Sequence, residues 1–74
     1  TGHKKRFMDA LDEAKGMGEN KADLGKVREY FYSTLVDVQD ESKRKIWKRA
    51  FQSVVDMGLI SASETQVFDE RDSL

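Results

Sequence analysis

The residues best suited to chemistry in this sequence are basic side chains gathered in its third quarter. Between Ser42 and Ser53 there are five basic residues and no acidic one. Lys and Arg bind phosphates and guanine edges, and Gln pairs with adenine, so a helix carrying them can enter a major groove about 12 Å wide. The pattern therefore favours duplex DNA as the ligand. The candidate DNA-binding residues are Ser42, Lys43, Arg44, Lys45, Lys48, Arg49 and Gln52.

A solvated helix face is the simpler explanation of such a run. Two features favour a functional role instead. The run contains no Glu that would form i,i+4 ion pairs, and cations near the start of a helix oppose its macrodipole. Residues that destabilise their own helix in this way suggest a function outside the helix, such as binding a ligand. A second cluster, formed by Lys4, Lys5 and Arg6, opens the chain. We interpret it as solubilising the terminus, with DNA-backbone contacts as the alternative.

Catalysis and metal binding have little support in the sequence. There is no cysteine, and the one histidine, His3, lies in the expected cloning remnant, which leaves Ser-His-Asp chemistry without a base. The carboxylates of Asp9, Asp12 and Glu13 lie near Lys5 and Lys15 and are typical of a solvated helix face. The segment from residue 37 to 41 lacks the glycine of a calcium loop. We predict no enzyme, no catalytic residue, no metal or cofactor, and no small-molecule substrate.

Apolar spacing predicts two helices before the basic run. The first is expected over residues 4–15, with an inward stripe at Phe7, Ala10, Leu11 and Ala14. Gly16 and Gly18 then allow the chain to leave the helix. The second is expected over residues 24–35, with Asp23 as its N-cap.

The basic run belongs to a third predicted helix, which Asp40 caps and Gly58 closes. Its apolar positions cover about half of the circumference, which predicts burial against more than one neighbour; they are Ile46, Trp47, Ala50, Phe51, Val54, Val55 and Met57. Lys45, Lys48 and Arg49 are expected on the opposite side, whereas Lys43 and Arg44 lie near the first turn and can reach either flank. Most aromatic residues, Tyr30 among them, follow the helical stripes and are expected in the core, whereas Tyr32 is the aromatic residue expected at the surface.

After Gly58, two short runs around a polar turn predict a β-hairpin, formed by residues 59–60 and 66–68. Three helices followed by a hairpin predict a mainly α fold of the winged helix-turn-helix type. A three-helix bundle with a disordered tail is the alternative. The hairpin has no Lys or Arg and carries Glu64, which weakens any proposal that it grips DNA.

The 74 residues allow one small domain, residues 1–74, with thirteen basic and fourteen acidic side chains. Apolar runs are no longer than three residues, too short for a membrane span or a signal peptide. We therefore expect a cytoplasmic protein without a membrane partner. Residues 1–3 are expected to be a cloning remnant, and residues from about 69 to 74 are expected to fray.

Two segments resemble a known family: "ADLGKVREYFY" (residues 22–32) and "DESKRKIWKRAFQSVVDMGLI" (residues 40–60). They are similar to the C-terminal winged-helix segment of phage and plasmid replication proteins with an ATPase or primase-helicase core. The resemblance covers about half of the chain. It implies a DNA-binding appendage, with residues 43–45, 48, 49 and 52 on the recognition helix and the catalytic core of the parent protein as a possible partner. The alternatives are a module that docks an acidic protein partner or its own parent protein, and the DNA-binding domain of a transcription regulator.

Overall fold

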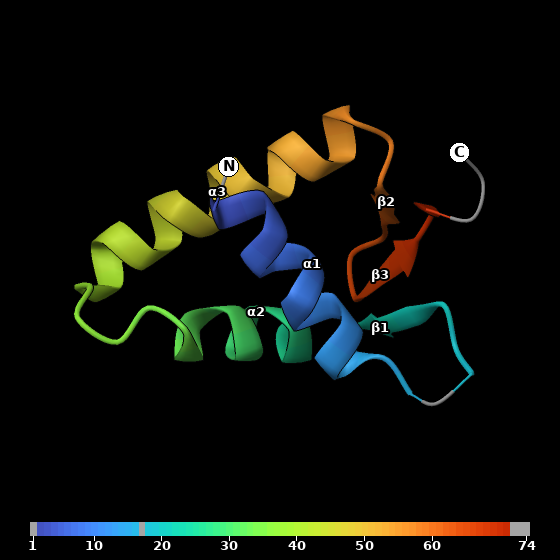
Figure 1. The fold of residues 1–74 in the computed structure, drawn as a ribbon, viewed down its shortest axis with the longest axis horizontal. Coiled ribbons are helices and arrows are strands. Elements are labelled where there is room, and N and C mark those ends of the chain that lie inside the picture. Colours follow the sequence, from blue (N-terminus) through green and yellow to red (C-terminus); the bar gives the residue numbers. More distant parts are fainter. Residues whose placement is uncertain (1, 17, 72–74) are drawn as a thin grey trace.

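The computed structural model describes residues 2–16 and 18–71, and it contains three helices and three strands. In chain order they are α1 (Gly2–Ala14), β1 (Lys21–Asp23), α2 (Leu24–Ser33), α3 (Asp40–Asp56), β2 (Ile60–Ala62) and β3 (Gln66–Asp69). The molecule is mainly helical, and a small antiparallel sheet closes one end of it (Figure 1). The predicted helices and C-terminal hairpin are therefore confirmed, and β1 is an additional strand. No helix among these residues has the length and apolar character needed to cross a membrane.

α1 forms because its apolar residues recur at helical spacing and share one face. Phe7 and Leu11 are fully buried on that face, and Ala10 is buried beside them. The helix begins two residues before the predicted start, so Gly2 and His3 belong to it, and it ends at Ala14. Gly18 then adopts a positive φ of 77°, which lets the chain turn back toward β1.

α2 begins where Asp23 caps it, as predicted. The Asp23 backbone is extended, and its carboxylate accepts a hydrogen bond of 3.1 Å from the Lys26 N–H. The helix ends at Ser33, two residues before the predicted end. The hydroxyl of Ser33 donates to the carbonyl of Tyr30, and that of Thr34 donates to the carbonyl of Phe31. These local bonds replace the next helical turn.

α3 is the longest helix, with 17 residues. Its N-cap is Gln39, which makes no side-chain capping bond; Asp40, predicted as the cap, is instead the first helical residue. Gly58 follows the helix with a φ of 75°, and the N–H groups of Gly58 and Leu59 donate to the carbonyls of Val55 and Val54. This is the Schellman arrangement, which confirms Gly58 as the predicted stop.

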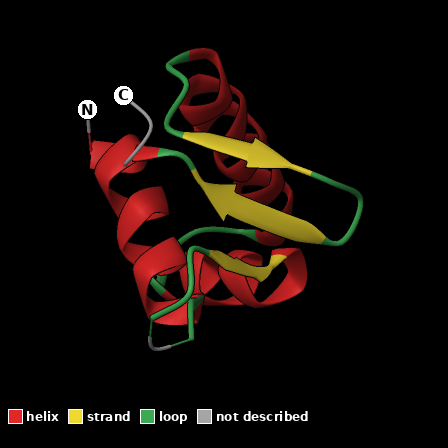
Figure 2. Cartoon of the chain, turned by 90° about the vertical axis from the view of Figure 1, so that its right-hand side faces the viewer, coloured by secondary structure: helices red, strands yellow, loops and turns green. Residues whose placement is uncertain are grey.

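The sheet has β3 at its centre, with β1 and β2 antiparallel on either side (Figure 2). Val67 pairs with Ala22 of β1 and with Ala62 of β2, and it is fully buried. Described residues 60–71 thus fold back onto the helices, unlike the disordered tail of the alternative hypothesis. The predicted fraying does not begin at Asp69, which ends β3; residues 72–74 lie outside the described part of the chain.

The core is centred on aromatic rings from all three helices. Phe7 stacks on Trp47 with centroids 5.0 Å apart, meets Phe51 edge-on at 5.8 Å and lies 6.1 Å from Phe31. Each such pair contributes about 0.5–1.5 kcal/mol beyond the area that it buries. This cluster fixes the crossing of α1 over α3.

The two tyrosines exchange the places predicted for them. Tyr30 is 41% exposed, so its predicted place in the core is wrong. Tyr32 is half-buried, and its ring meets that of Trp47 edge-on at 6.4 Å. The reason is the way α1 packs over Phe31: Tyr30 lies 100° further around α2 and faces a hollow instead of the core.

Candidate nucleic-acid interface

The candidate residues lie on α3, mostly on the side that faces away from the core. Ala50 and Val54 are buried, and they define the inner side of the helix. Lys45, Lys48 and Arg49 follow the i, i+3, i+4 spacing of the opposite side. Six candidates are exposed: Ser42, Arg44, Lys45, Lys48, Arg49 and Gln52. The prediction that the cationic side of this helix faces solvent therefore agrees with the structure.

Lys43 differs from the other candidates. It is half-buried, and it precedes Trp47 by four residues and Ala50 by seven, so it lies on the inner side of α3 near its first turn. The aliphatic part of a lysine can pack there while its ammonium group reaches water. Lys43 is thus the candidate least available to a ligand on the outer side.

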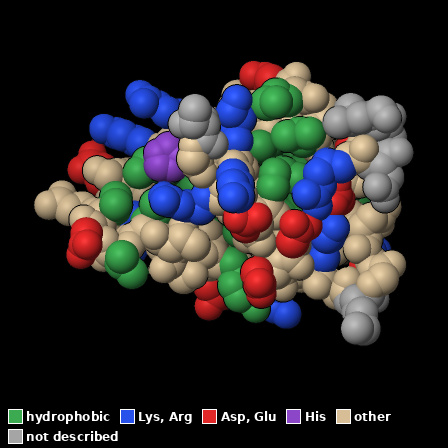
Figure 3. Space-filling view, viewed as in Figure 1, with side chains coloured by type: hydrophobic (Ala, Val, Ile, Leu, Met, Phe, Trp, Pro, Cys, Tyr) green, Lys and Arg blue, Asp and Glu red, His purple; other side chains and the backbone are tan. Residues whose placement is uncertain are grey.

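The exposed cations of α3 form no ion pair within the described part of the chain, where all ion pairs involve Lys15 or Arg71. Figure 3 shows Lys and Arg side chains projecting over the region that α3 occupies in Figure 1. We call the surface formed by Arg44, Lys45, Lys48 and Arg49 the basic face of α3. Its charge is available to an external anion.

Acidic residues bound the basic face at both ends. Asp40 and Glu41 lie in the first turn, where they complement the helix macrodipole and offset the unfavourable placement of the cations inferred from sequence. At the other end, Asp56 accepts a hydrogen bond of 2.8 Å from the side-chain amide of Gln52. That bond uses one of the two N–H donors of the amide, and a bidentate adenine contact would need the other donor together with the amide oxygen as acceptor.

The β2–β3 turn adds no cation to this surface. Glu64 is exposed at the turn, and the chain has no Lys or Arg from residue 59 to 70. The hydroxyl of Ser63 stabilises the turn by accepting a hydrogen bond of 3.1 Å from the Gln66 N–H. The hairpin is therefore ordered and acidic, as the sequence indicated.

Arg71 and Lys15 form an ion-pair cluster with Asp69 and Asp12 away from the basic face, and no spacing pattern in the sequence indicates it. Both cations contact Asp69 Oδ2 at 2.7 Å, and both also pair with Asp12. The hydrogen bond from Arg71, assisted by the one from Lys15, holds the pKa of Asp69 well below its usual range, although burial acts in the opposite direction. Hydrogen bonds to Asp69 and Asp12 raise the pKa of Arg71, and the bond to Asp69 raises that of Lys15. The cluster joins the end of α1 to β3.

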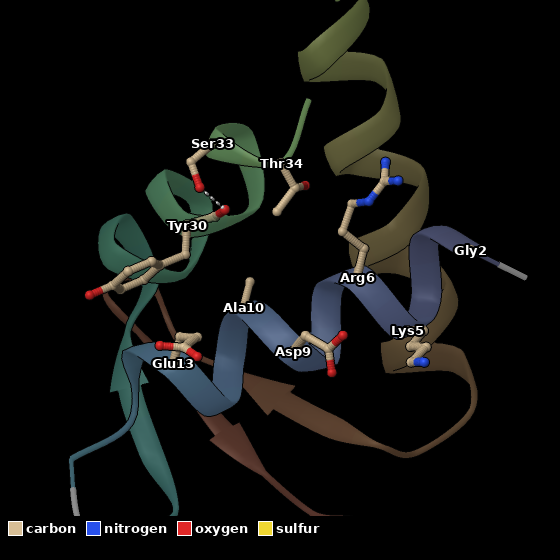
Figure 4. Close-up of a pocket in the computed structure, with 9 residues that line it drawn as sticks. All are labelled: Gly2, Lys5, Arg6, Asp9, Ala10, Glu13, Tyr30, Ser33 and Thr34. Carbon is tan, nitrogen blue, oxygen red and sulfur yellow. Dashed lines mark hydrogen bonds between the residues drawn. The ribbon is translucent and has the colours of Figure 1, made fainter. Parts of the chain in front are cut away.

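An open hollow of about 410 Å³ lies between α1 and α2 (Figure 4). Ala10 lies at its centre, and the small side chains of Ser33 and Thr34 leave space opposite. Lys5 and Arg6 line it together with Asp9 and Glu13, so its charges are mixed. No group of three His, Cys, Asp or Glu side chains suited to a metal ion occurs among the residues described.

The fold and the surface charge are thus the observations from which a function must be inferred. Comparison of the chain with protein-family models, with curated proteins and with solved structures finds no match.

Proposed function

We propose that this chain is a non-catalytic winged-helix module that binds duplex DNA through the basic face of α3. The observation that carries the proposal is a set of four exposed cations on one rigid helix, free of ion pairs within the described residues. Aromatic packing of Trp47 and Phe51 against Phe7 anchors the inner side of the same helix.

The topology supports the proposal. The order α1-β1-α2-α3-β2-β3, with β3 between the other two strands, is compatible with a winged helix in which α2 and α3 form the helix-turn-helix. The sequence resemblance extends the proposal to a role in DNA replication, as an appendage of a larger protein whose catalytic core is a further partner. If the chain is instead the DNA-binding domain of a transcription regulator, it would also bind DNA through the basic face of α3.

The dimensions of the basic face suit a major groove. From Arg44 to Arg49 the helix advances five residues, or about 7.5 Å at 1.5 Å per residue, and a helix with side chains is about 10–12 Å wide. The groove is about 12 Å wide. Four phosphate contacts would give a slope of log K against log salt of roughly −3.6. The acidic hairpin is assigned no contact with DNA.

Fluorescence anisotropy with a short labelled duplex at low salt tests the proposal. The variant Lys45→Glu/Lys48→Glu/Arg49→Glu should abolish binding because it turns the basic face into an acidic one. Three exposed cations on β1 and α2 provide a control with the same net charge change: Lys21→Glu/Lys26→Glu/Arg28→Glu. The control should retain most of the affinity, and circular dichroism should verify that both variants are folded. Equal affinity of the two triple variants would refute the assignment of the surface.

The alternative is that the basic face docks an acidic protein segment. The observation in its favour is that the hairpin carries no Lys or Arg. A hairpin that does not contact DNA needs no cation. Size-exclusion chromatography at two salt concentrations, with and without duplex, separates the two functions. Self-association at low salt with no change in mobility on adding DNA would favour the alternative.

A further inference from the structure

We propose that the first turn of α1 extends the basic face of α3, and that Lys4 and Lys5 contact backbone phosphates of the same duplex beside those reached by α3. This inference rests on the proposed function and adds a second element to the DNA-binding surface. It replaces the interpretation of these residues as a merely solubilising cluster.

The packing of Phe7 brings the two helices together. Phe7 lies in the second turn of α1, and its ring stacks on Trp47 and meets Phe51 of α3. Figures 1 and 4 both show the start of α1 crossing α3 near the middle of that helix. The first turn of α1 is therefore fixed against α3 by the core and is not a loose extension.

The spacing on each helix places cations at this crossing. Arg44 and Lys48 precede Trp47 and Phe51 by three residues, so they lie next to these rings on the same flank of α3. On α1, Lys4 precedes Phe7 by three residues and likewise adjoins the contact. Lys4 is half-buried and Lys5 is exposed. Arg44, Lys48 and Lys4 thus border one aromatic contact, and Lys5 follows on the outer side of α1, at the edge of the α1–α2 hollow.

The first turn of α1 has no acidic residue of its own, and the nearest carboxylates, those of Asp9 and Glu13, lie with Lys5 at the α1–α2 hollow. The segment from residue 2 to 8 has no Asp or Glu, and Lys4 and Lys5 form no ion pair within the part of the chain that the structure describes. Figure 3 shows Lys, Arg and His side chains gathered around the start of α1, next to those over α3. Phosphate is the anion that such a spread of single cations suits, because each ammonium group can reach a separate backbone oxygen.

The distance between the helices fits a DNA backbone. Packed helices have axes about 8–10 Å apart, and successive phosphates of one strand advance about 3.4 Å along the duplex axis. With α3 in the major groove, the start of α1 would therefore lie about three phosphates away along the bordering strand. Such contacts add affinity without reading the sequence.

The test is the salt dependence of duplex binding by the full chain, measured by anisotropy between about 50 and 200 mM salt. Lys4→Gln/Lys5→Gln should lower the magnitude of the slope by about 1.8, which corresponds to roughly 10- to 60-fold weaker binding near 0.1 M salt. Lys21→Gln/Lys26→Gln removes the same charge from β1 and α2, and it should leave the slope of the wild-type chain unchanged.

The outcomes separate this inference from the proposed function. If the wild-type chain does not bind the duplex, or if the charge reversal on α3 leaves binding intact, the proposed function fails. If that reversal abolishes binding but the Lys4/Lys5 variant matches the Lys21/Lys26 control, only the contribution of α1 is refuted. A slope reduced equally by both neutral pairs would also refute it, because the binding charge would then be spread over the whole molecule.

Discussion

We expect the ion-pair cluster around Asp69 to contribute to the free energy of unfolding. The Asp69 side chain is only 10% exposed and accepts bonds from both Lys15 and Arg71. Removing one partner of a buried pair costs about 3–5 kcal/mol, whereas exposed pairs contribute about 0–1 kcal/mol. Because Lys15 and Arg71 reach solvent and keep Asp12 as a partner, we expect Asp69→Asn to lower the free energy of unfolding by about 2 kcal/mol at pH 7.

The stabilisation by Asp69 should depend on pH. The pKa of Asp69 is lowered in the folded chain, so its contribution is fully present above the ordinary Asp value of about 3.9 and is lost as the pH falls toward the folded value. The difference in unfolding free energy between wild type and Asp69→Asn should therefore shrink by about 1 kcal/mol between pH 7 and pH 3.

Urea unfolding followed by the fluorescence of Trp47, the one tryptophan of the chain, measures both quantities. Asp12→Asn is the matched control, since the Asp12 side chain is 46% exposed and should contribute under about 1 kcal/mol. An equal loss in the two variants, or a wild-type advantage over Asp69→Asn that is the same at pH 3 and pH 7, would show that the cluster does not stabilise the fold as described.

Three further predictions concern the core, a helix end and the basic face. Phe7→Ala should cost about 3–5 kcal/mol and leave the chain largely unfolded by circular dichroism at 25 °C, whereas the half-exposed Tyr30→Ala should cost under about 1 kcal/mol; similar losses would contradict the core assignment. Gly58→Ala should lower the free energy of unfolding by about 1–2 kcal/mol, because Ala is strained at a φ of 75°, and an unchanged melting temperature would argue against that strain. Asp56→Asn should strengthen duplex binding severalfold by removing a carboxylate from the end of the basic face. Equal or weaker binding in fluorescence anisotropy would argue against a duplex bound at the basic face of α3.

Local sequence signals were sufficient to predict the helices. Apolar spacing located all three, Asp23 marked the start of α2, and Gly58 marked the end of α3. These features depend on neighbours within a few residues, which is why they can be predicted from the chain alone. The exposure of Lys45, Lys48 and Arg49 followed from the same spacing.

Features that depend on distant partners were not predicted. β1 has three residues, and only Ala22 is apolar; its strand conformation comes from pairing with β3. Tyr30 follows the helical stripe, but the small Ala10 opposite leaves a hollow where the core was expected. The partners Asp12, Lys15 and Arg71 lie on separate segments, so no spacing pattern links them to Asp69.

The central position of β3 also determines how the chain can be completed during synthesis. β1 and β2 are not neighbours in the sheet, so neither has a strand to pair with until residues 66–69 leave the ribosome. Pairing Ala22 with Val67 closes a loop across 45 positions of the chain, whereas the β2–β3 hairpin is local. A nascent chain that ends before β3 therefore has no sheet for the helices to pack on. The four residues of β3 supply the pairing partner of both β1 and β2.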